Sequence, residues 1–133
     1  MIEHTADLGM EFSGATPEAL FSAAGEGVFD TISGLKDIDC SETIEIEVSG
    51  SDFEDLLINW LRELLYYQQV KEMLFRSFKI EEINETRLYA RVSGEKFDPA
   101  RHEIKTEIKA ATYHDLKMEK SGQDWTARVI FDV

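Results

Sequence analysis

The last nine residues of the chain, residues 125–133 (WTARVIFDV), decide how the rest of the sequence is interpreted. Their side chains alternate in the way a strand requires, with Trp125, Ala127, Val129 and Phe131 on one face and Thr126, Arg128, Ile130 and Asp132 on the other. A chain end frays unless something holds it, so an apolar strand here predicts docking in a sheet. Such a strand would hold the Asp132 side chain and the α-carboxylate of Val133 on one rigid element.

The composition indicates which partners suit the chain. Its 133 residues suit one domain, residues 1–133, with a core of its own. The 27 Asp and Glu residues outnumber the 14 Lys and Arg residues, which gives a formal net charge of -13. A protein that binds nucleic-acid phosphates directly needs the opposite balance. Metal ions or a basic protein surface are therefore better partners for this chain than free nucleic acid.

The sequence also indicates a compartment. Cys40 is the single cysteine, so no internal disulfide can form, as is usual in a reducing cytosol. No signal peptide is recognised at the start, and no apolar run approaches the roughly 18–20 residues that span a bilayer. We therefore expect a soluble, cytoplasmic protein with no membrane partner.

Two helices are predicted. The first begins after Thr16, which suits an N-cap, has Pro17 at its first position, and ends before Gly34. The second begins at Ser51, which forms the Ser-x-x-Glu capping-box pattern with Glu54. Its apolar residues recur at three- and four-residue spacing, which is typical of a helix that faces a core.

The remaining elements are strands. They are predicted over residues 8–13, 43–48, 74–80, 86–92, 104–114, 115–120 and 125–133. The strands are not separated by crossover helices, which disfavours a parallel, doubly wound fold. The order favours an α+β fold with a mainly antiparallel β-sheet and two helices packed on one face.

Acidic oxygen atoms form the best candidate site. Asp7 follows the first few residues, while Asp132 and the Val133 carboxylate end the last strand. Carboxylate oxygens are the ligands that hard cations prefer. Periodicity leaves open whether Asp7 meets Asp132 in space, and Asp132 could instead be only a polar end to a strand.

No motif specifies covalent catalysis, so no catalytic residue is predicted. The histidines His4, His102 and His114 lack the spacing of zinc ligands. The sequence contains no glycine-rich phosphate loop and no nucleophile elbow. Lys109, which precedes two alanines, is either a strand-surface lysine or a functional residue.

Four separated motifs resemble the archease family: HTAD at residues 4–7, LLINWLRELLY at 56–66, EIKAATYH at 107–114 and VIFDV at 129–133. The resemblance spans essentially the whole chain. It implies an accessory protein rather than an enzyme. Archeases assist the tRNA-splicing RNA ligase, which joins 2′,3′-cyclic phosphate or 3′-phosphate ends to 5′-hydroxyl RNA with GTP and a divalent metal. They promote ligase guanylylation and multiple turnover, and RNA would be reached only through the ligase.

The resemblance also implies a site. It maps a metal site, usually a calcium site, onto Asp7, Asp132 and Val133, and it marks further motif positions as functional contacts, namely His4, Lys109 and His114. Two other functions stay open. One is a chaperone-like modulator of a tRNA cytosine methyltransferase, and the other is a metal-dependent hydrolase that uses the same carboxylates.

Two features depart from the family pattern. Only three residues precede the HTAD motif, where family members often have a few more, and an edge strand there could be shortened. The last residue is Val133, where the family often has Ile. A terminal carboxylate needs no particular side chain, so we expect the site to survive.

Overall fold

The computed structural model describes residues 6–133 as two helices and six strands. In chain order these are β1 (Asp7–Gly14), α1 (Pro17–Ile32), β2 (Glu42–Ser49), α2 (Phe53–Gln69), β3 (Met73–Ile83), β4 (Arg87–Lys96), β5 (Ala110–Ser121) and β6 (Asp124–Asp132). The strands form two antiparallel sheets, sheet A in the order β1-β6-β5 and sheet B in the order β2-β4-β3. Neither helix is long and apolar enough to cross a membrane.

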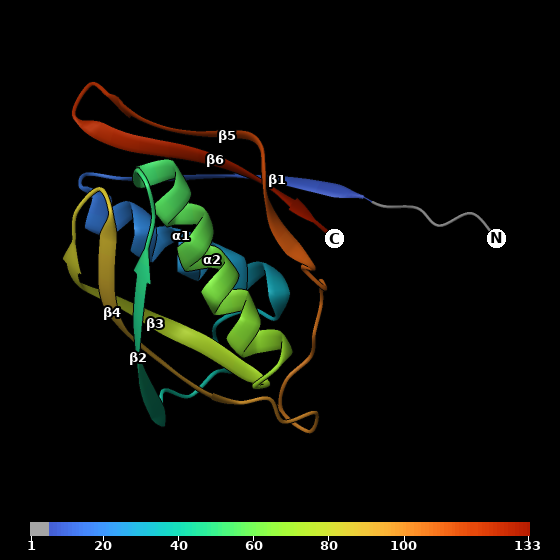
Figure 1. Ribbon diagram of the computed structural model, residues 1–133. Coiled ribbons are helices and arrows are strands. Elements are labelled where there is room, and N and C mark those ends of the chain that lie inside the picture. The colour runs from blue at the N-terminus through green and yellow to red at the C-terminus, as the bar shows by residue number, and fades with distance from the viewer. Residues whose placement is uncertain (1–5) are drawn as a thin grey trace.

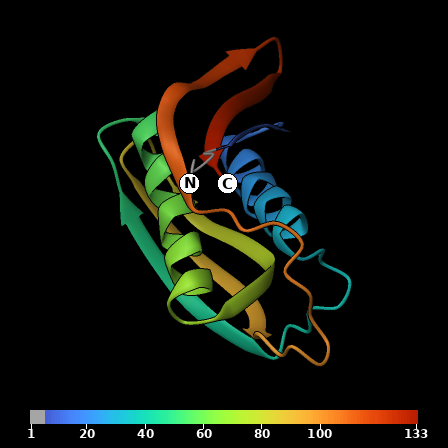
Figure 2. The ribbon, with the colours of Figure 1, turned by 90° about the vertical axis from the view of Figure 1, so that its right-hand side faces the viewer.

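The predicted α+β class, with antiparallel strands and two helices, is confirmed. The strands form two three-stranded sheets, however, and both helices lie between them (Figures 1 and 2). The apolar surface of the helices is wide enough to pack against both sheets. On α1, for example, Phe21, Val28 and Phe29 are all fully buried. The inner face of each sheet covers part of this apolar surface, and the outer face of each sheet meets solvent.

The helix starts follow local signals, with one correction. Thr16 caps α1 through a hydrogen bond that its hydroxyl oxygen accepts from the amide of Ala19 (3.1 Å). The N-cap of α2 is Asp52 rather than the predicted Ser51, because the Asp52 carboxylate accepts from the amide of Asp55 (2.8 Å). The Asp55 carboxylate accepts in turn from the amide of Ser51 (2.9 Å). The reciprocal capping pattern is therefore shifted along the chain and uses aspartates.

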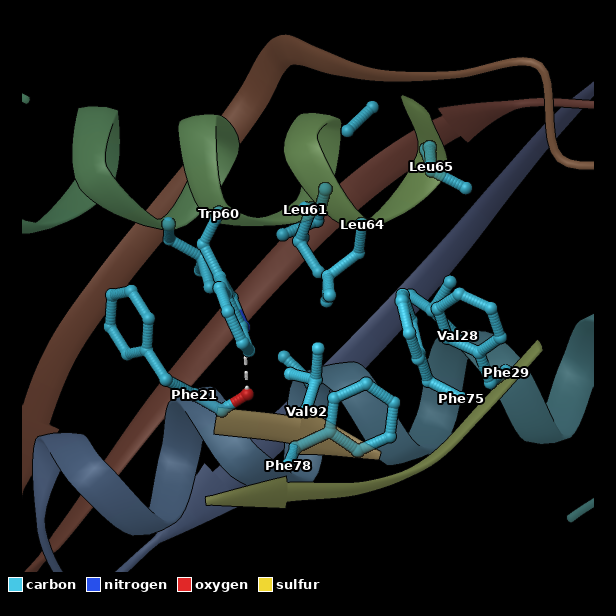
Figure 3. Packing of buried hydrophobic residues seen from close by; sticks show 14 of the residues in the cluster. Phe21, Val28, Phe29, Trp60, Leu61, Leu64, Leu65, Phe75, Phe78 and Val92 are labelled. Carbon is cyan, nitrogen blue, oxygen red and sulfur yellow. Dashed lines mark hydrogen bonds between the residues drawn. The ribbon is translucent and has the colours of Figure 1, made fainter. Parts of the chain in front are cut away.

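Trp60 of α2 is the largest fully buried side chain of the core (Figure 3). Its indole N–H donates to the carbonyl oxygen of Phe21 on α1 (3.0 Å), which joins the two helices inside the apolar cluster. Gly25 of α1 lies under the ring of Phe78, where an added Cβ would come within 2.5 Å of that ring. The absence of a side chain at Gly25 therefore permits close packing of α1 against β3.

One predicted strand starts later than expected. Residues 104–109 are irregular, and β5 begins only at Ala110. Their backbone is bound elsewhere, since the amides of Lys105 and Thr106 both donate to the carbonyl oxygen of Ile32 at the end of α1 (2.7 and 3.2 Å). Ile108 is buried in the core. The segment thus bonds to the end of α1, and the prediction that the strand includes residues 104–109 is wrong.

Two further boundaries differ from the prediction. Residues 115–120 are the second half of β5, which continues past an irregularity between Thr112 and Lys117. Residues 94–96, expected in a loop, belong to β4. Gly94 permits this because β3 passes so close that a Cβ there would overlap the carbonyl oxygen of Leu74.

Candidate functional site

The two candidate aspartates lie directly opposite each other. Strand β6 is the central strand of sheet A, and its register with β1 pairs Asp132 with Asp7. The amide of Val133 donates to the carbonyl oxygen of Ala6 (3.0 Å), so Ala6 and Val133 form a hydrogen-bonded pair of the ladder. Hydrogen-bonded and non-hydrogen-bonded pairs alternate in an antiparallel ladder. Asp7 and Asp132 are therefore a non-hydrogen-bonded pair, whose Cα atoms are about 4.5 Å apart and whose side chains approach most closely.

Both carboxylates face outward. Their neighbours in the ladder, Leu8 and Phe131, point to the core side of sheet A, and Phe131 is fully buried. Asp7 is exposed and Asp132 is partly exposed, as strand alternation requires. Like charges directly opposite each other in a sheet are destabilising. The two carboxylates that repel each other lie at a solvent-accessible end of sheet A.

Lys109 is held beside this pair through its backbone. Its amide donates to the carbonyl oxygen of Asp132 (2.8 Å). The side-chain amide of Gln69, at the end of α2, donates to the carbonyl oxygens of Ile108 (2.8 Å) and Lys109 (3.0 Å). The Lys109 side chain is exposed and forms no ion pair with any of residues 6–133. A free ammonium group thus extends from a rigid backbone close to the C-terminal strand end.

The candidate histidine His114 stands apart from this arrangement. His114 lies in the irregular part of β5, exposed, with its Nε2 3.4 Å from a carboxylate oxygen of Asp115. Asp115 also pairs with Arg128, which precedes Asp132 by four positions along β6 (3.5 Å). The structure therefore places His114 further along sheet A than the carboxylate pair. His4 lies outside the described residues.

Sequence reasoning missed the contacts that hold β5 against α2. The hydroxyl of Tyr113 donates to the carboxylate of Asp55 (2.6 Å), and the Arg62 guanidinium lies 4.8 Å from the centre of the Tyr113 ring. The hydrogen bond to Asp55, followed by burial, raises the pKa of Tyr113. The same bond lowers the pKa of Asp55. Arg62 and Tyr113 both lie in motif segments of the sequence, but no spacing rule connects a helix to a distant strand.

A partly buried ion cluster lies where the residue 97–109 loop meets the residue 33–41 loop. Glu95 binds both guanidinium nitrogens of Arg101 (2.7 and 3.0 Å) and contacts Nε2 of His102 (3.1 Å). It also accepts from the amide of Asp39 (2.6 Å). Chiefly the Arg101 contact lowers the pKa of Glu95 to about 2. Among residues 6–133 no buried side-chain polar atom lacks a partner. The cluster is therefore a satisfied structural clamp.

The donor set at the strand ends fits a hard cation. Two opposed carboxylates supply the oxygen ligands that Ca²⁺ takes, and a cation between them would relieve their repulsion. Among residues 6–133 no group of three His, Cys, Asp or Glu side chains converges as a metal site of side chains alone would require. Further oxygens would have to come from the α-carboxylate of Val133, from water or from a partner. Asp7, Asp132 and Val133 thus remain a predicted site.

The comparisons with known proteins agree with this fold. The sequence model of the Archease protein family (MTH1598/TM1083) matches residues 1–133. Protein archease of Pyrococcus abyssi is 42% identical over 136 residues, covering 98% of this chain and 95% of that protein. Protein archease of Methanopyrus kandleri is 36% identical over 135 residues, covering 99% and 96%.

Two solved structures share the architecture. The solution structure of Methanobacterium thermoautotrophicum protein 1598 has a TM-score of 0.79 and 28% identity, covering 99% of this chain and 96% of that one. The crystal structure of a Thermotoga maritima archease, described as a possible chaperone, has a TM-score of 0.67 and 29% identity, covering 100% and 95%. With a family match over all its residues and close relatives along nearly its whole length, the chain belongs to the archease family.

Proposed function

We propose that this chain is a non-catalytic accessory protein that activates the tRNA-splicing RNA ligase, promoting guanylylation and repeated turnover of that enzyme. The observation that carries the proposal is the pairing of Asp7 with Asp132 at an exposed strand end of sheet A. Two like charges are held together there at a cost to the sheet. A fold retains such repulsion most readily where a cation or a cationic partner offsets it.

Charge supports a protein partner over RNA. The net charge of -13 opposes direct contact with phosphates, whereas an RNA-binding enzyme carries a basic surface that such a protein can approach. Lys109 would then add one positive charge beside two negative ones, held in place by Gln69 and Asp132. This mixed arrangement suits a contact with charged groups and metal ions in the active site of another protein.

Calcium, or another divalent metal, is the proposed cofactor. Asp7 and Asp132 would hold it with their side chains, and Val133 would contribute its α-carboxylate. When bound, the ion would supply positive charge for anionic oxygen atoms. Strand β6 is paired on both sides, so it cannot shift along its neighbours. Its position therefore fixes where the carboxylates of the proposed site lie.

The decisive experiment is ligation by the ligase from the same organism, under multiple-turnover conditions, with and without this protein. We expect repeated turnover only when the protein is present, and faster formation of the ligase–guanylate intermediate. Equal turnover in the two reactions would sink the proposal. RNA cleavage or ligation by the purified protein alone would favour the enzyme hypothesis instead.

Matched variants separate the site from the fold. Asp7→Asn and Asp132→Asn keep the side-chain size and remove one charge each, so we expect both to lose stimulation with an unchanged or higher melting temperature. Glu119→Gln, on an exposed position of β5, is the control for a lost charge. Should the two Asn variants stimulate the ligase as well as this control, the carboxylate pair has no role in the activity.

A further inference from the structure

A groove of about 340 Å³ lies at the end of α2, between that helix, the start of β3 and the residue 97–109 loop. Apolar side chains form part of its lining, namely Met73, Leu74, Phe97 and Ile104. Met73 and Leu74 are nearly buried, but Ile104 is 37% exposed. Val70, next to the lining residue Gln69, is 60% exposed. We call this the α2 groove.

The charged residues that line the α2 groove are both acidic. They are Glu72, just after α2, and Glu107, just before the buried Ile108. Both are exposed, and neither forms an ion pair with any of residues 6–133. Several other glutamates of the described chain do pair with a lysine or arginine, as Glu95 does with Arg101. The groove therefore combines accessible apolar surface with two carboxylates that form no ion pair within residues 6–133.

Glu72 occupies a backbone position that disfavours it. Its φ angle is 56°, in the left-handed region that glycine or asparagine usually fills after a helix. Its carbonyl oxygen accepts from the amide of Phe97 (2.7 Å), so the strained backbone is held against the loop. Residues kept in strained backbone often serve a function, which points to the Glu72 side chain.

We propose that the α2 groove receives a segment of the partner ligase that presents an apolar side chain next to a lysine or arginine. This inference rests on the proposed function, because the partner is taken to be the ligase. The apolar side chain would cover Ile104, and the basic residue would pair with Glu72 and Glu107. Gln69 both lines the groove and binds the Lys109 carbonyl oxygen, so the groove adjoins Lys109. One partner surface could therefore contact both.

The test measures the affinity of the purified ligase for labelled protein, with groove variants compared to wild type. Glu72→Gln and Glu107→Gln should each weaken binding about three- to fivefold, as for an exposed charge pair. Ile104→Asp should weaken it more than about tenfold, because it places a charge where an apolar side chain docks. Glu26→Gln, on the exposed side of α1, removes the same charge elsewhere and should leave the affinity unchanged.

Glu72→Gly separates binding from stability. It removes the carboxylate and relieves the left-handed strain, so it should weaken binding as much as Glu72→Gln while melting no lower than wild type. A general loss of structure would lower both quantities together. Should Ile104→Asp fail to fold, Glu72→Gly still decides the question.

Three results would overturn the inference. If wild type neither binds nor stimulates the ligase, the proposed function and the groove inference both fail. If wild type binds but every groove variant keeps its affinity within about twofold, the groove inference fails and the proposed function stands. If Ile104→Asp instead abolishes self-association in sedimentation without changing ligase binding, the occupant is a second copy of this chain.

Discussion

Glu95 provides the sharpest test of how the two long loops are held. In the folded chain its pKa is lowered from 4.5 to about 2, chiefly by Arg101. The unfolded chain therefore binds a proton at Glu95 more readily than the folded one. The interval between the two values corresponds to about 3 kcal/mol of folding free energy. We expect about 2–3 kcal/mol, since the side chain is 11% exposed and solvent weakens the contacts somewhat.

The perturbation is Glu95→Gln, which keeps the shape and removes the charge. Its side-chain NH₂ group would face the donors of Arg101 and His102, whose bonds to the carboxylate would be lost. At pH 7 we expect unfolding to require about 2–3 kcal/mol less than in wild type. The Glu95 contribution is fully present above pH 4.5 and is lost as the pH falls toward 2. The difference in unfolding free energy between wild type and variant should therefore shrink as the pH falls through that interval.

Urea unfolding, followed by the fluorescence of the buried Trp60 and the partly buried Trp125, measures the difference in unfolding free energy at several pH values between 7 and 3. Glu45→Gln is the matched control, because Glu45 also binds an arginine and a tyrosine hydroxyl but is 61% exposed. That control should change the unfolding free energy by less than about 1 kcal/mol. A Glu95→Gln gap that stays constant between pH 7 and pH 3 would refute the reasoning, because the carboxylate would then not titrate as the cluster requires.

Three further outcomes are expected. Gly94→Ala should unfold the domain or destabilise it by more than about 3 kcal/mol, measured by urea unfolding, because its Cβ would overlap the Leu74 carbonyl oxygen. Millimolar calcium, compared with a chelator control, should raise the melting temperature of wild type but not that of Asp7→Asn. An equal rise in melting temperature in both proteins would argue against a cation between Asp7 and Asp132. Two alanines added after Val133 would move the terminal charge by about 3.3 Å per residue. Ligase stimulation should then be lost while the melting temperature stays unchanged. An extended protein that stimulates the ligase fully would exclude a role for that carboxylate.

Part of the candidate site could be predicted because its signals are local or belong to whole motifs. The alternation of residues 125–133 predicts β6, and the motif resemblance connects Asp7 with Asp132. The structure adds the register that sets these two residues opposite each other. Register depends on how two distant strands align, and alternation within each strand carries no information about the other. The role of the pair stays a prediction.

Other features could not be found in the sequence because they arise from contacts between distant segments. The Gln69 bonds to Ile108 and Lys109, and the contact of Tyr113 with Asp55, join α2 to β5 through side chains with no shared periodicity. The strained backbone of Glu72 likewise cannot be predicted from the sequence, because only the backbone geometry shows that its φ is positive.

The sequence by itself located both helices and five of the six strands to within several residues, since turn residues, caps and hydrophobic period act over short distances. It divided β5 between two predicted strands, residues 104–114 and 115–120. Tertiary structure alone decided that the strands divide into two sheets with the helices between them. It also decided that residues 104–109 do not form a strand. Their alternating pattern suits a strand, but the carbonyl oxygen of Ile32 at the end of α1 lies within reach of two of their amides. Hydrogen bonding to the helix end and burial of Ile108 outweighed the local preference.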